Sequence, residues 1–137
     1  MTSEICIQIV NQLSDNYSYI IYSKKNNKAL VLDPAESKSN IDFIKKNNLS
    51  LEALLITHNH ADHTSGIKDL LNFQKVDVYS SNLKIYGTTK LIQDKETINF
   101  QFIEFEVIST PGHTIDHIVY YSKKNNILFS GDTLFSL

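Results

Sequence analysis

The chain has 137 residues, of which 42% are hydrophobic and 20% are charged. This balance is typical of a folded globular protein and excludes a disordered chain, and the length suits one domain over residues 1–137. The formal net charge is -2 and every basic residue is a lysine, so the composition gives no support for a nucleic-acid-binding protein. The single cysteine, Cys6, excludes an internal disulfide framework and a Cys-rich zinc finger.

The sequence shows neither a membrane span nor a secretory leader. No stretch approaches the ~20 consecutive apolar residues that cross a bilayer. Residues 1–4 do not begin a basic segment followed by an apolar run. We therefore expect a cytoplasmic protein with no membrane partner.

The predicted elements begin with consecutive strands, and further strands then alternate with helices. This order indicates a mixed α/β fold in which strands predominate. Apolar alternation and short apolar runs predict strands at 5–9, 17–22, 29–32, 51–57, 76–79, 117–121 and 127–129. Polar runs predict hairpin turns at 24–27 and 123–126. Apolar residues at helical spacing predict helices over 39–48, with Ser39 as the N-cap, and over 64–73. Segment 98–108 changes the parity of its apolar residues, which predicts a turn or bulge near Phe102.

The five histidines fall in only two short windows, each at the end of a predicted strand. Three lie in the run THNHADH at 57–63, and two lie in the run PGHTIDH at 111–117. Imidazole is a common ligand of transition metals. This grouping therefore points to a metal centre rather than to scattered surface histidines.

The spacing within the first window favours two metal ions. His58 and His60 are separated by one residue, so on extended backbone their rings point to the same side and can hold one ion. Asp62 and His63 follow where the chain turns into the next helix, and they are better placed for a second ion. A single tetrahedral zinc ion has no room for all four side chains together with a water molecule.

His113 and Asp132 extend this centre from other parts of the chain. His113 lies on a Pro-Gly turn after a strand, and Asp132 follows the strand at 127–129 in the run SGDT. A carboxylate can bridge two cations and hold them about 3.5–4 Å apart. The first site would then contain His58, His60, His113 and Asp132, and the second would contain Asp62, His63 and Asp132.

Three other residues are expected to have supporting roles. His117 opens a strand, and we interpret it as structural or as a support for a ligand. Asp33 closes a buried strand, where a structural turn is the first interpretation and orientation of a ligating histidine is the second. Cys6 alternates with core positions and is interpreted as a small apolar filler.

The runs THNHADH at 57–63, TPGHT at 110–114 and GDTLF at 131–135, in this order, resemble the metallo-β-lactamase superfamily. The runs DNY at 15–17, DP at 33–34 and HIVYY at 117–121 are most similar to its glyoxalase II group, the hydroxyacylglutathione hydrolases. The resemblance implies an αββα sandwich with a two-metal site at one edge of the sheets. It assigns the first metal to His58, His60 and His113, the second to Asp62 and His63, and the bridge to Asp132.

The resemblance also implies a reaction and a small-molecule substrate, a glutathione thioester. The glyoxalase II group hydrolyses S-D-lactoylglutathione to D-lactate and glutathione. A hydroxide shared by two divalent metals, zinc first and iron or manganese as substitutes, attacks the thioester carbonyl in such a reaction. Asp62 and Asp132 would serve catalysis by holding these metals, and no serine or cysteine nucleophile is required.

The match ends at Leu137, five residues after Asp132, whereas in the family more of the domain follows. The part that follows includes one further histidine of the second metal site and a helical region that holds glutathione. We therefore expect an incomplete sandwich and a weak second metal site. We also expect an open sheet edge suited to self-association or to a complementing chain.

Three hypotheses on function are open at this point. The first is a glyoxalase II-like hydrolase whose activity is impaired by truncation. The second is a non-catalytic metal-binding remnant, or a fragment that a partner completes. The third is a persulfide dioxygenase with a single iron, although the run GDTLF at 131–135 and the aromatic pair after His117 favour glyoxalase II.

Overall fold

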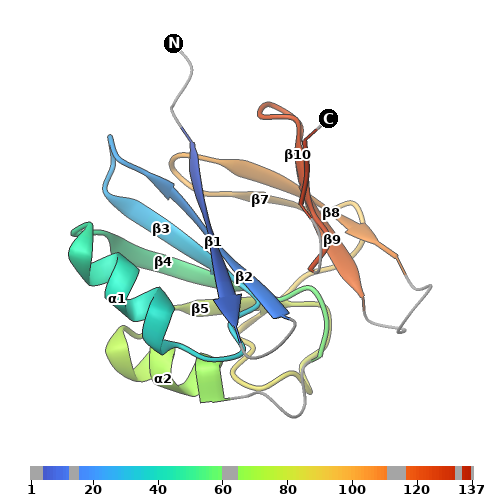
Figure 1. Cartoon of the computed structure of the whole chain (residues 1–137). Helices are drawn as coiled ribbons and strands as arrows, with labels where there is room; N and C mark the ends of the chain where they lie inside the picture. The colour runs from blue at the N-terminus through green and yellow to red at the C-terminus, as the bar shows by residue number, and fades with distance from the viewer. Residues whose placement is uncertain (1–4, 13–15, 60–64, 111–116, 132–133, 137) are drawn as a thin grey trace.

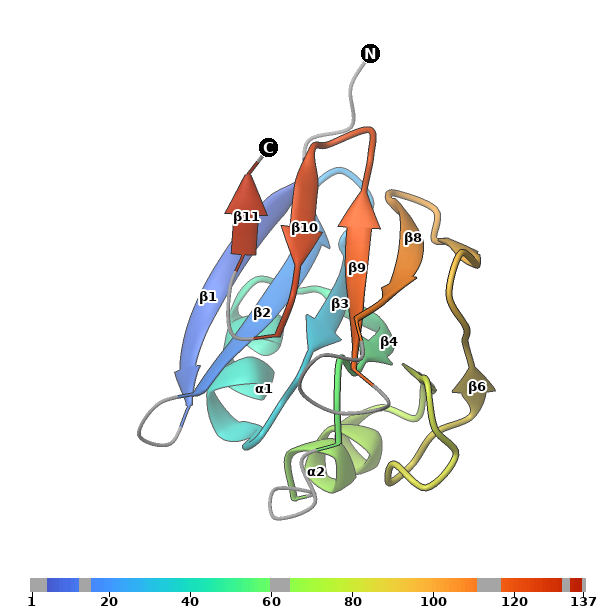
Figure 2. The ribbon, with the colours of Figure 1, turned by 90° about the vertical axis from the view of Figure 1, so that its right-hand side faces the viewer.

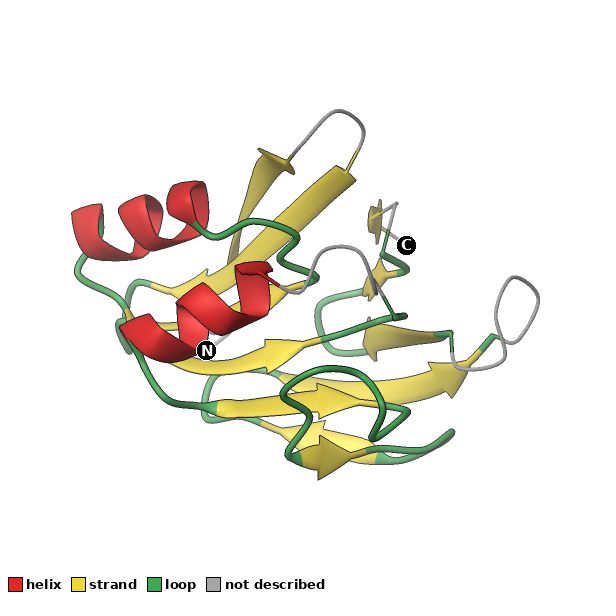
Figure 3. Cartoon of the chain, turned by 90° about the horizontal axis from the view of Figure 1, so that it is seen from below, coloured by secondary structure: helices red, strands yellow, loops and turns green. Residues whose placement is uncertain are grey.

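The computed structural model describes residues 5–12, 16–59, 65–110, 117–131 and 134–136. Over these ranges the chain forms two β-sheets packed face to face, and both helices lie on the outer side of the first sheet (Figures 1 and 3). The layers therefore run helix, sheet, sheet, which confirms the expected incomplete αββα sandwich. Neither of the helices within the described ranges has the length and apolar character needed to span a membrane.

The first sheet brings the ends of several parallel strands to one edge. Its order is β1 (Cys6–Gln12), β2 (Asn16–Ser23), β3 (Lys28–Leu32), β4 (Ser50–Leu55), β5 (Asp77–Ser80) and β6 (Lys90–Leu91). The first three strands are antiparallel, whereas β3 to β6 are parallel. Helices α1 (Lys38–Lys46) and α2 (Ser65–Phe73) form the crossovers from β3 to β4 and from β4 to β5. The C-terminal ends of β3, β4 and β5 consequently lie side by side.

The second sheet is antiparallel throughout and lies across the first (Figure 2). Its order is β11 (Leu134–Ser136), β10 (Ile127–Phe129), β9 (Ile118–Ser122), β8 (Glu104–Ser109) and β7 (Thr97–Asn99). The predicted turn near Phe102 is confirmed between β7 and β8, where the Phe100 N–H donates to the Ile103 carbonyl at 2.8 Å. Phe102 and Ile103 are both buried because this turn points two consecutive apolar side chains inward.

Strand alternation divides the apolar side chains between two clusters. On β3, Leu30 packs between the two sheets, whereas its neighbour Val31 packs with the helices. The centre of the cluster between the sheets contains three fully buried aromatic side chains, Phe105, Tyr120 and Phe129. The Phe105 ring meets the other two edge to face, with ring centroids 6.0 and 6.1 Å apart.

Both predicted hairpin turns are present, and the same hexapeptide forms each of them. The run YSKKNN occurs at 22–27 and again at 121–126. The last residues of the two runs, Asn27 and Asn126, adopt left-handed φ angles of 56° and 54°. Asparagine tolerates this conformation better than most residues, so the sequence specifies the same turn twice.

Some local predictions were shifted or wrong. Helix α1 begins at Lys38 with Ser37, not Ser39, as the N-cap, and the Ser37 hydroxyl donates to Asp69 of α2 at 3.1 Å instead of capping its own helix. This hydrogen bond joins the residue that precedes α1 to α2. Cys6 is half-buried rather than a core filler, since its neighbours Ile5 and Ile7 pack against the core cluster from the other face of β1. The short strands β6 and β11 were not predicted, because with one and two apolar residues they form neither an alternation nor an apolar run.

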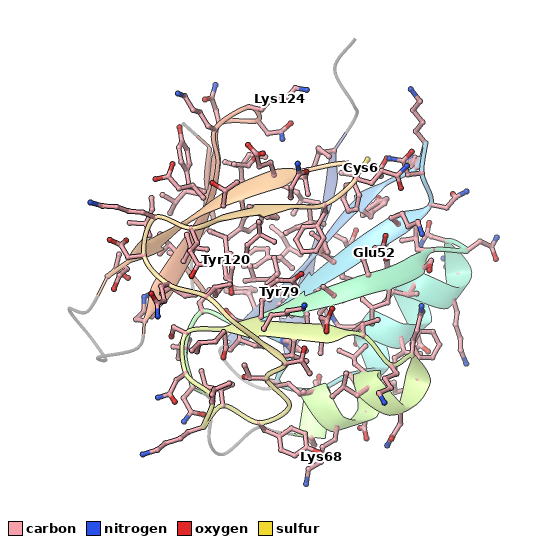
Figure 4. All side chains as sticks on the ribbon, turned by 180° about the vertical axis from the view of Figure 1, so that it is seen from behind. Cys6, Glu52, Lys68, Tyr79, Tyr120 and Lys124 are labelled. Atoms are coloured by element: carbon pink, nitrogen blue, oxygen red, sulfur yellow. The ribbon has the colours of Figure 1, made fainter. Side chains whose placement is uncertain are left out.

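The Tyr120 hydroxyl links the two sheets, and removing it should lower stability. It donates to the Ile56 carbonyl at 2.7 Å and lies 3.3 Å from the Tyr79 carbonyl, and Figure 4 shows both tyrosines where the sheets meet. Burial raises the pKa of Tyr120 well above its ordinary value, so this hydroxyl stays protonated and donates. We expect Tyr120→Phe to lower the free energy of unfolding by about 1–2 kcal/mol, measured by urea denaturation.

Tyr121→Phe is the matched control for this prediction, because Tyr121 neighbours Tyr120 on β9 but is only half-buried. Its unfolding midpoint should stay close to that of the wild type. A Tyr120→Phe midpoint equal to that of the control would contradict the proposed link between the sheets.

Candidate metal centre

The ends of four strands meet at one edge of the sandwich. Asp33 directly follows β3, and its N–H donates to the Leu55 carbonyl at the end of β4 at 2.9 Å. Thr57, two residues further along, accepts a hydrogen bond at its carbonyl from the Ile118 N–H at the start of β9, also at 2.9 Å. Gly131, which follows β10, packs against the same threonine. Sites in open α/β sheets commonly form at such C-terminal strand ends.

Asp33 and Thr57 form a series of hydrogen bonds that reaches Nδ1 of the His58 ring. Asp33 Oδ1 accepts from the Thr57 N–H at 2.8 Å, and Oδ2 accepts from the Thr57 hydroxyl at 2.5 Å. Thr57 Oγ1 in turn lies 2.9 Å from His58 Nδ1. With Asp33 ionised, the single hydroxyl proton of Thr57 goes to this carboxylate, and the Thr57 oxygen is left to accept a proton from Nδ1. His58 is then the tautomer that carries its lone pair on Nε2, as a metal ligand requires.

The environment of Asp33 explains why the threonine matters. Only 5% of this residue is exposed, and burial raises the pKa of its carboxyl. The hydrogen bonds from Thr57 and the electrostatic interactions with the nearby His58 and His117 act in the opposite direction and lower this pKa. A buried carboxylate is tolerated only where its oxygens are hydrogen-bonded. The second interpretation of Asp33, orientation of a ligating histidine, is therefore supported by these contacts.

Gly131 brings the chain segment before Asp132 against this arrangement. Its φ is 94°, a left-handed conformation that favours glycine. A Cβ atom at this position would lie 2.7 Å from Thr57 Oγ1 and 3.5 Å from His58 Cε1. The absence of a side chain therefore allows the backbone to approach His58 immediately before Asp132.

The segment that carries His113 has its two ends held together beside His58. Its preceding residue, Thr110, donates its N–H to the His117 carbonyl at 2.9 Å. The His117 ring stacks on the His58 ring, with centroids 5.4 Å apart and planes inclined by 25°. Thr110 and His117, the described residues on either side of the segment with His113, are therefore joined to each other beside His58, the first predicted ligand.

Of the predicted metal ligands, His58 is the one that the structure describes. The others, which lie outside the described residues, are His60, Asp62, His63, His113 and Asp132. Within the described ranges no three His, Cys, Asp or Glu side chains come together as a metal site. The chemistry of the described part fits a divalent metal, since His58 has a hydroxyl partner at Nδ1, the arrangement typical of histidines that bind a metal through Nε2.

Two threonines of this centre were not recognised from the sequence. Thr57 contacts Nδ1 of His58, and Thr110 Oγ1 lies 2.6 Å from Nδ1 of His117. Each threonine opens one of the histidine-containing runs, THNHADH and TPGHT. A histidine that binds a metal through one ring nitrogen usually forms a hydrogen bond through the other. A threonine close in sequence to a candidate ligand was therefore the signal that could have indicated these contacts.

Comparison with known sequences gives a consistent family. The model of the Metallo-beta-lactamase superfamily matches residues 13–137. The hydroxyacylglutathione hydrolase of Francisella tularensis subsp. novicida (strain U112) is 41% identical over 130 residues, which are 93% of this chain and 50% of that protein. The hydroxyacylglutathione hydrolase of Pseudoalteromonas translucida (strain TAC 125) is 36% identical over 132 residues, 95% of this chain and 51% of that protein. The chain thus spans about half the length of the curated relatives it matches.

Comparison with solved structures supports the fold. The BLEG-1 B3 metallo-beta-lactamase superimposes with a TM-score of 0.78 at 24% identity, over 95% of this chain and 73% of that chain. ETHE1 from Myxococcus xanthus superimposes with a TM-score of 0.76 at 23% identity, over 85% of this chain and 53% of that chain. At these identities the likeness concerns the arrangement of the elements and not the reaction.

The Thr57 hydroxyl should be needed for tight metal binding. Thr57→Val keeps the shape of the side chain but removes the group that joins Asp33 to His58. We expect Zn²⁺ affinity, measured by isothermal titration calorimetry, to fall by about 10–100-fold. Thr57→Ser restores the hydroxyl and should recover most of this loss. Equal affinities for the valine variant and the wild type would refute the role given to Thr57.

A side chain at Gly131 should disturb the metal centre, whereas one at Gly87 should not. Both glycines have left-handed φ angles, 94° and 80°. At Gly87 the new Cβ would meet methyl groups of side chains and no polar group, with Ile67 Cγ2 at 3.1 Å and Leu71 Cδ1 at 3.3 Å. Both alanine variants should lose about 1–2 kcal/mol of stability from the backbone conformation.

Only Gly131→Ala should also weaken Zn²⁺ binding, because its Cβ would displace the Thr57 hydroxyl. Thermal denaturation and zinc titration on the two variants separate the effects. A similar loss of zinc affinity in both would show that it follows from stability alone.

Proposed function

Because the chain belongs to the metallo-beta-lactamase superfamily, we propose that it binds divalent metal ions and hydrolyses a glutathione thioester. The observation that carries the metal part is the series Asp33, Thr57 and His58, which sets the His58 ring for binding through Nε2. The substrate class rests on the relatives, since hydroxyacylglutathione hydrolases are 36% and 41% identical to this chain. S-D-lactoylglutathione is the thioester we propose first.

The proposed ligands divide into two sets. The first metal is assigned to His58, His60, His113 and Asp132, and the second to Asp62, His63 and the shared Asp132. Two features of the described chain favour this division: Gly131 lies against His58, and the ends of the segment with His113 are held next to the same ring. The second set has fewer ligands of its own, so we propose that it binds its metal more weakly.

The chemistry divides between the metals and the chain. When bound, two divalent cations supply Lewis acidity, which lowers the pKa of a water molecule and polarises the thioester carbonyl. The chain holds and orients them: Asp33 and Thr57 keep the His58 ring in one tautomer, and Asp62 and Asp132 would provide carboxylate oxygens. The thiolate of glutathione leaves readily because a thiol is a much stronger acid than an alcohol, so no proton donor for the leaving group is required. Zinc is the metal we propose first, with iron and manganese as alternatives.

Turnover of the thioester tests this proposal directly. The zinc-loaded chain should consume S-D-lactoylglutathione, measured by loss of the thioester absorbance, and His60→Ala and Asp62→Ala should each lower kcat/KM at least about 100-fold. Lys124→Ala is the matched control, because this exposed lysine lies in the β9–β10 turn, at the end of β9 opposite His117 (Figure 4). If the metal-loaded wild type cleaves no glutathione thioester, catalysis by this chain is rejected.

Metal content and oxygen uptake distinguish the two alternatives. Two metals per chain would argue against a non-catalytic remnant, whereas one or none would favour it. A single iron, with oxygen consumption in the presence of glutathione persulfide, would favour a persulfide dioxygenase. Size-exclusion chromatography of the same sample would show whether the chain self-associates.

A further inference from the structure

His117 is the histidine to which the proposed ligand sets give no role, and it contacts one of the proposed ligands directly. Its ring stacks on that of His58, with centroids 5.4 Å apart and an interplanar angle of 25°. His58 follows β4 of the first sheet and His117 immediately precedes β9 of the second. The stacked pair therefore spans the two sheets at the edge where the metal centre is proposed.

The position of His117 is itself fixed by several contacts. Thr110 Oγ1 lies 2.6 Å from His117 Nδ1, and the Thr110 N–H donates to the His117 carbonyl at 2.9 Å. The next residue, Ile118, donates its N–H to the Thr57 carbonyl at 2.9 Å. Both the ring and the backbone of His117 are thus held by groups of the two sheets, which makes the ring a firm surface for His58.

A histidine ring needs such a surface if it is to hold one orientation. The torsion about the bond from Cβ to the ring is broad, because it joins a tetrahedral to a planar carbon. The contact between Thr57 Oγ1 and Nδ1 fixes one point of the His58 ring, and stacking on His117 restricts the plane in which the ring lies. The two contacts together determine the direction of Nε2.

We propose that His117 is a positioning residue for the metal centre: held by Thr110, its ring fixes the plane of the His58 imidazole and so directs Nε2 toward the metal. This inference rests on the proposed function, since it requires a metal at His58. It assigns no metal ligation to His117, whose Nδ1 faces the Thr110 hydroxyl. A merely structural His117 would stabilise the junction of the sheets without affecting metal affinity.

Cobalt binding by the full chain tests the proposal without reference to activity. Co²⁺ affinity is measured by competition with a chelating dye, and the visible absorption bands of bound Co²⁺ report its coordination geometry. We expect His117→Ala to weaken Co²⁺ binding by about 10–100-fold and to change these bands. His117→Phe keeps a ring for stacking and should lose clearly less affinity than the alanine variant.

Two variants of Thr110 test whether the hydroxyl that contacts the His117 ring is needed, apart from the stacking of that ring on His58. Thr110→Val should weaken binding because the His117 ring loses its hydroxyl partner, and Thr110→Ser should restore binding. Tyr121→Ala is the matched control, since it removes another half-buried ring that belongs to β9 itself but lies toward the opposite end of the strand. It should leave Co²⁺ affinity unchanged.

Thermal denaturation of each metal-free variant shows which ones are folded, and the phenylalanine and Thr110 variants carry the test if His117→Ala is not. An unchanged affinity and spectrum in folded His117→Ala would overturn the positioning role. Equal and complete loss in the alanine and phenylalanine variants would also overturn it, because that result indicates ligation by His117. Failure of the wild type itself to bind Co²⁺ would instead reject the metal centre, and the inference with it.

Discussion

The hydrogen bonds between Asp33 and Thr57 are the interaction on which the candidate centre depends. They join the ends of two parallel strands, satisfy a buried carboxylate and leave the threonine oxygen as an acceptor for His58. The same oxygen lies so close to Gly131 that a side chain there would collide with it. Asp33 and Thr57 thus join the ends of β3 and β4, contact the His58 ring, and lie against the backbone that leads to Asp132.

The residues after β4 serve the fold and the site together. The Ile56 carbonyl accepts the Tyr120 hydroxyl, and the Thr57 carbonyl accepts the Ile118 N–H, so two consecutive residues bind the second sheet. The side chains of Thr57 and His58 then begin the candidate centre. Packing between the sheets and orientation of the ring therefore use the same short segment.

Periodicity was enough to predict most of the elements and their order. The buried runs that became β3 and β4, the helices, and the turn near Phe102 all follow from local patterns of apolar residues. The short strands β6 and β11 could not be predicted, because they exist only through pairing with neighbours. The N-cap of α1 was misplaced for a similar reason, since Ser37 is held by Asp69, which is distant in the sequence.

The sequence predicts a set of candidate ligands, and it named Asp33 and His117 as possible supports without indicating which groups they contact. The run THNHADH and the grouping of all histidines indicate a metal centre from sequence spacing alone. The pairing of Asp33 with Thr57 joins residues 24 positions apart, and the stacking of His117 on His58 joins the two sheets. Contacts of this kind follow from the topology, so they became visible only when the strand ends were placed beside one another.

The protonation of the His58 ring tests most directly whether Asp33 and Thr57 prepare this residue to bind a metal. Nitrogen-15 NMR of the imidazole groups distinguishes a ring nitrogen that carries a proton from one that does not. We predict that Nδ1 of His58 is protonated in the metal-free chain and that the Nε2 resonance shifts when Zn²⁺ is added. A ring protonated on Nε2 alone, or a His58 signal that zinc leaves unchanged, would contradict it.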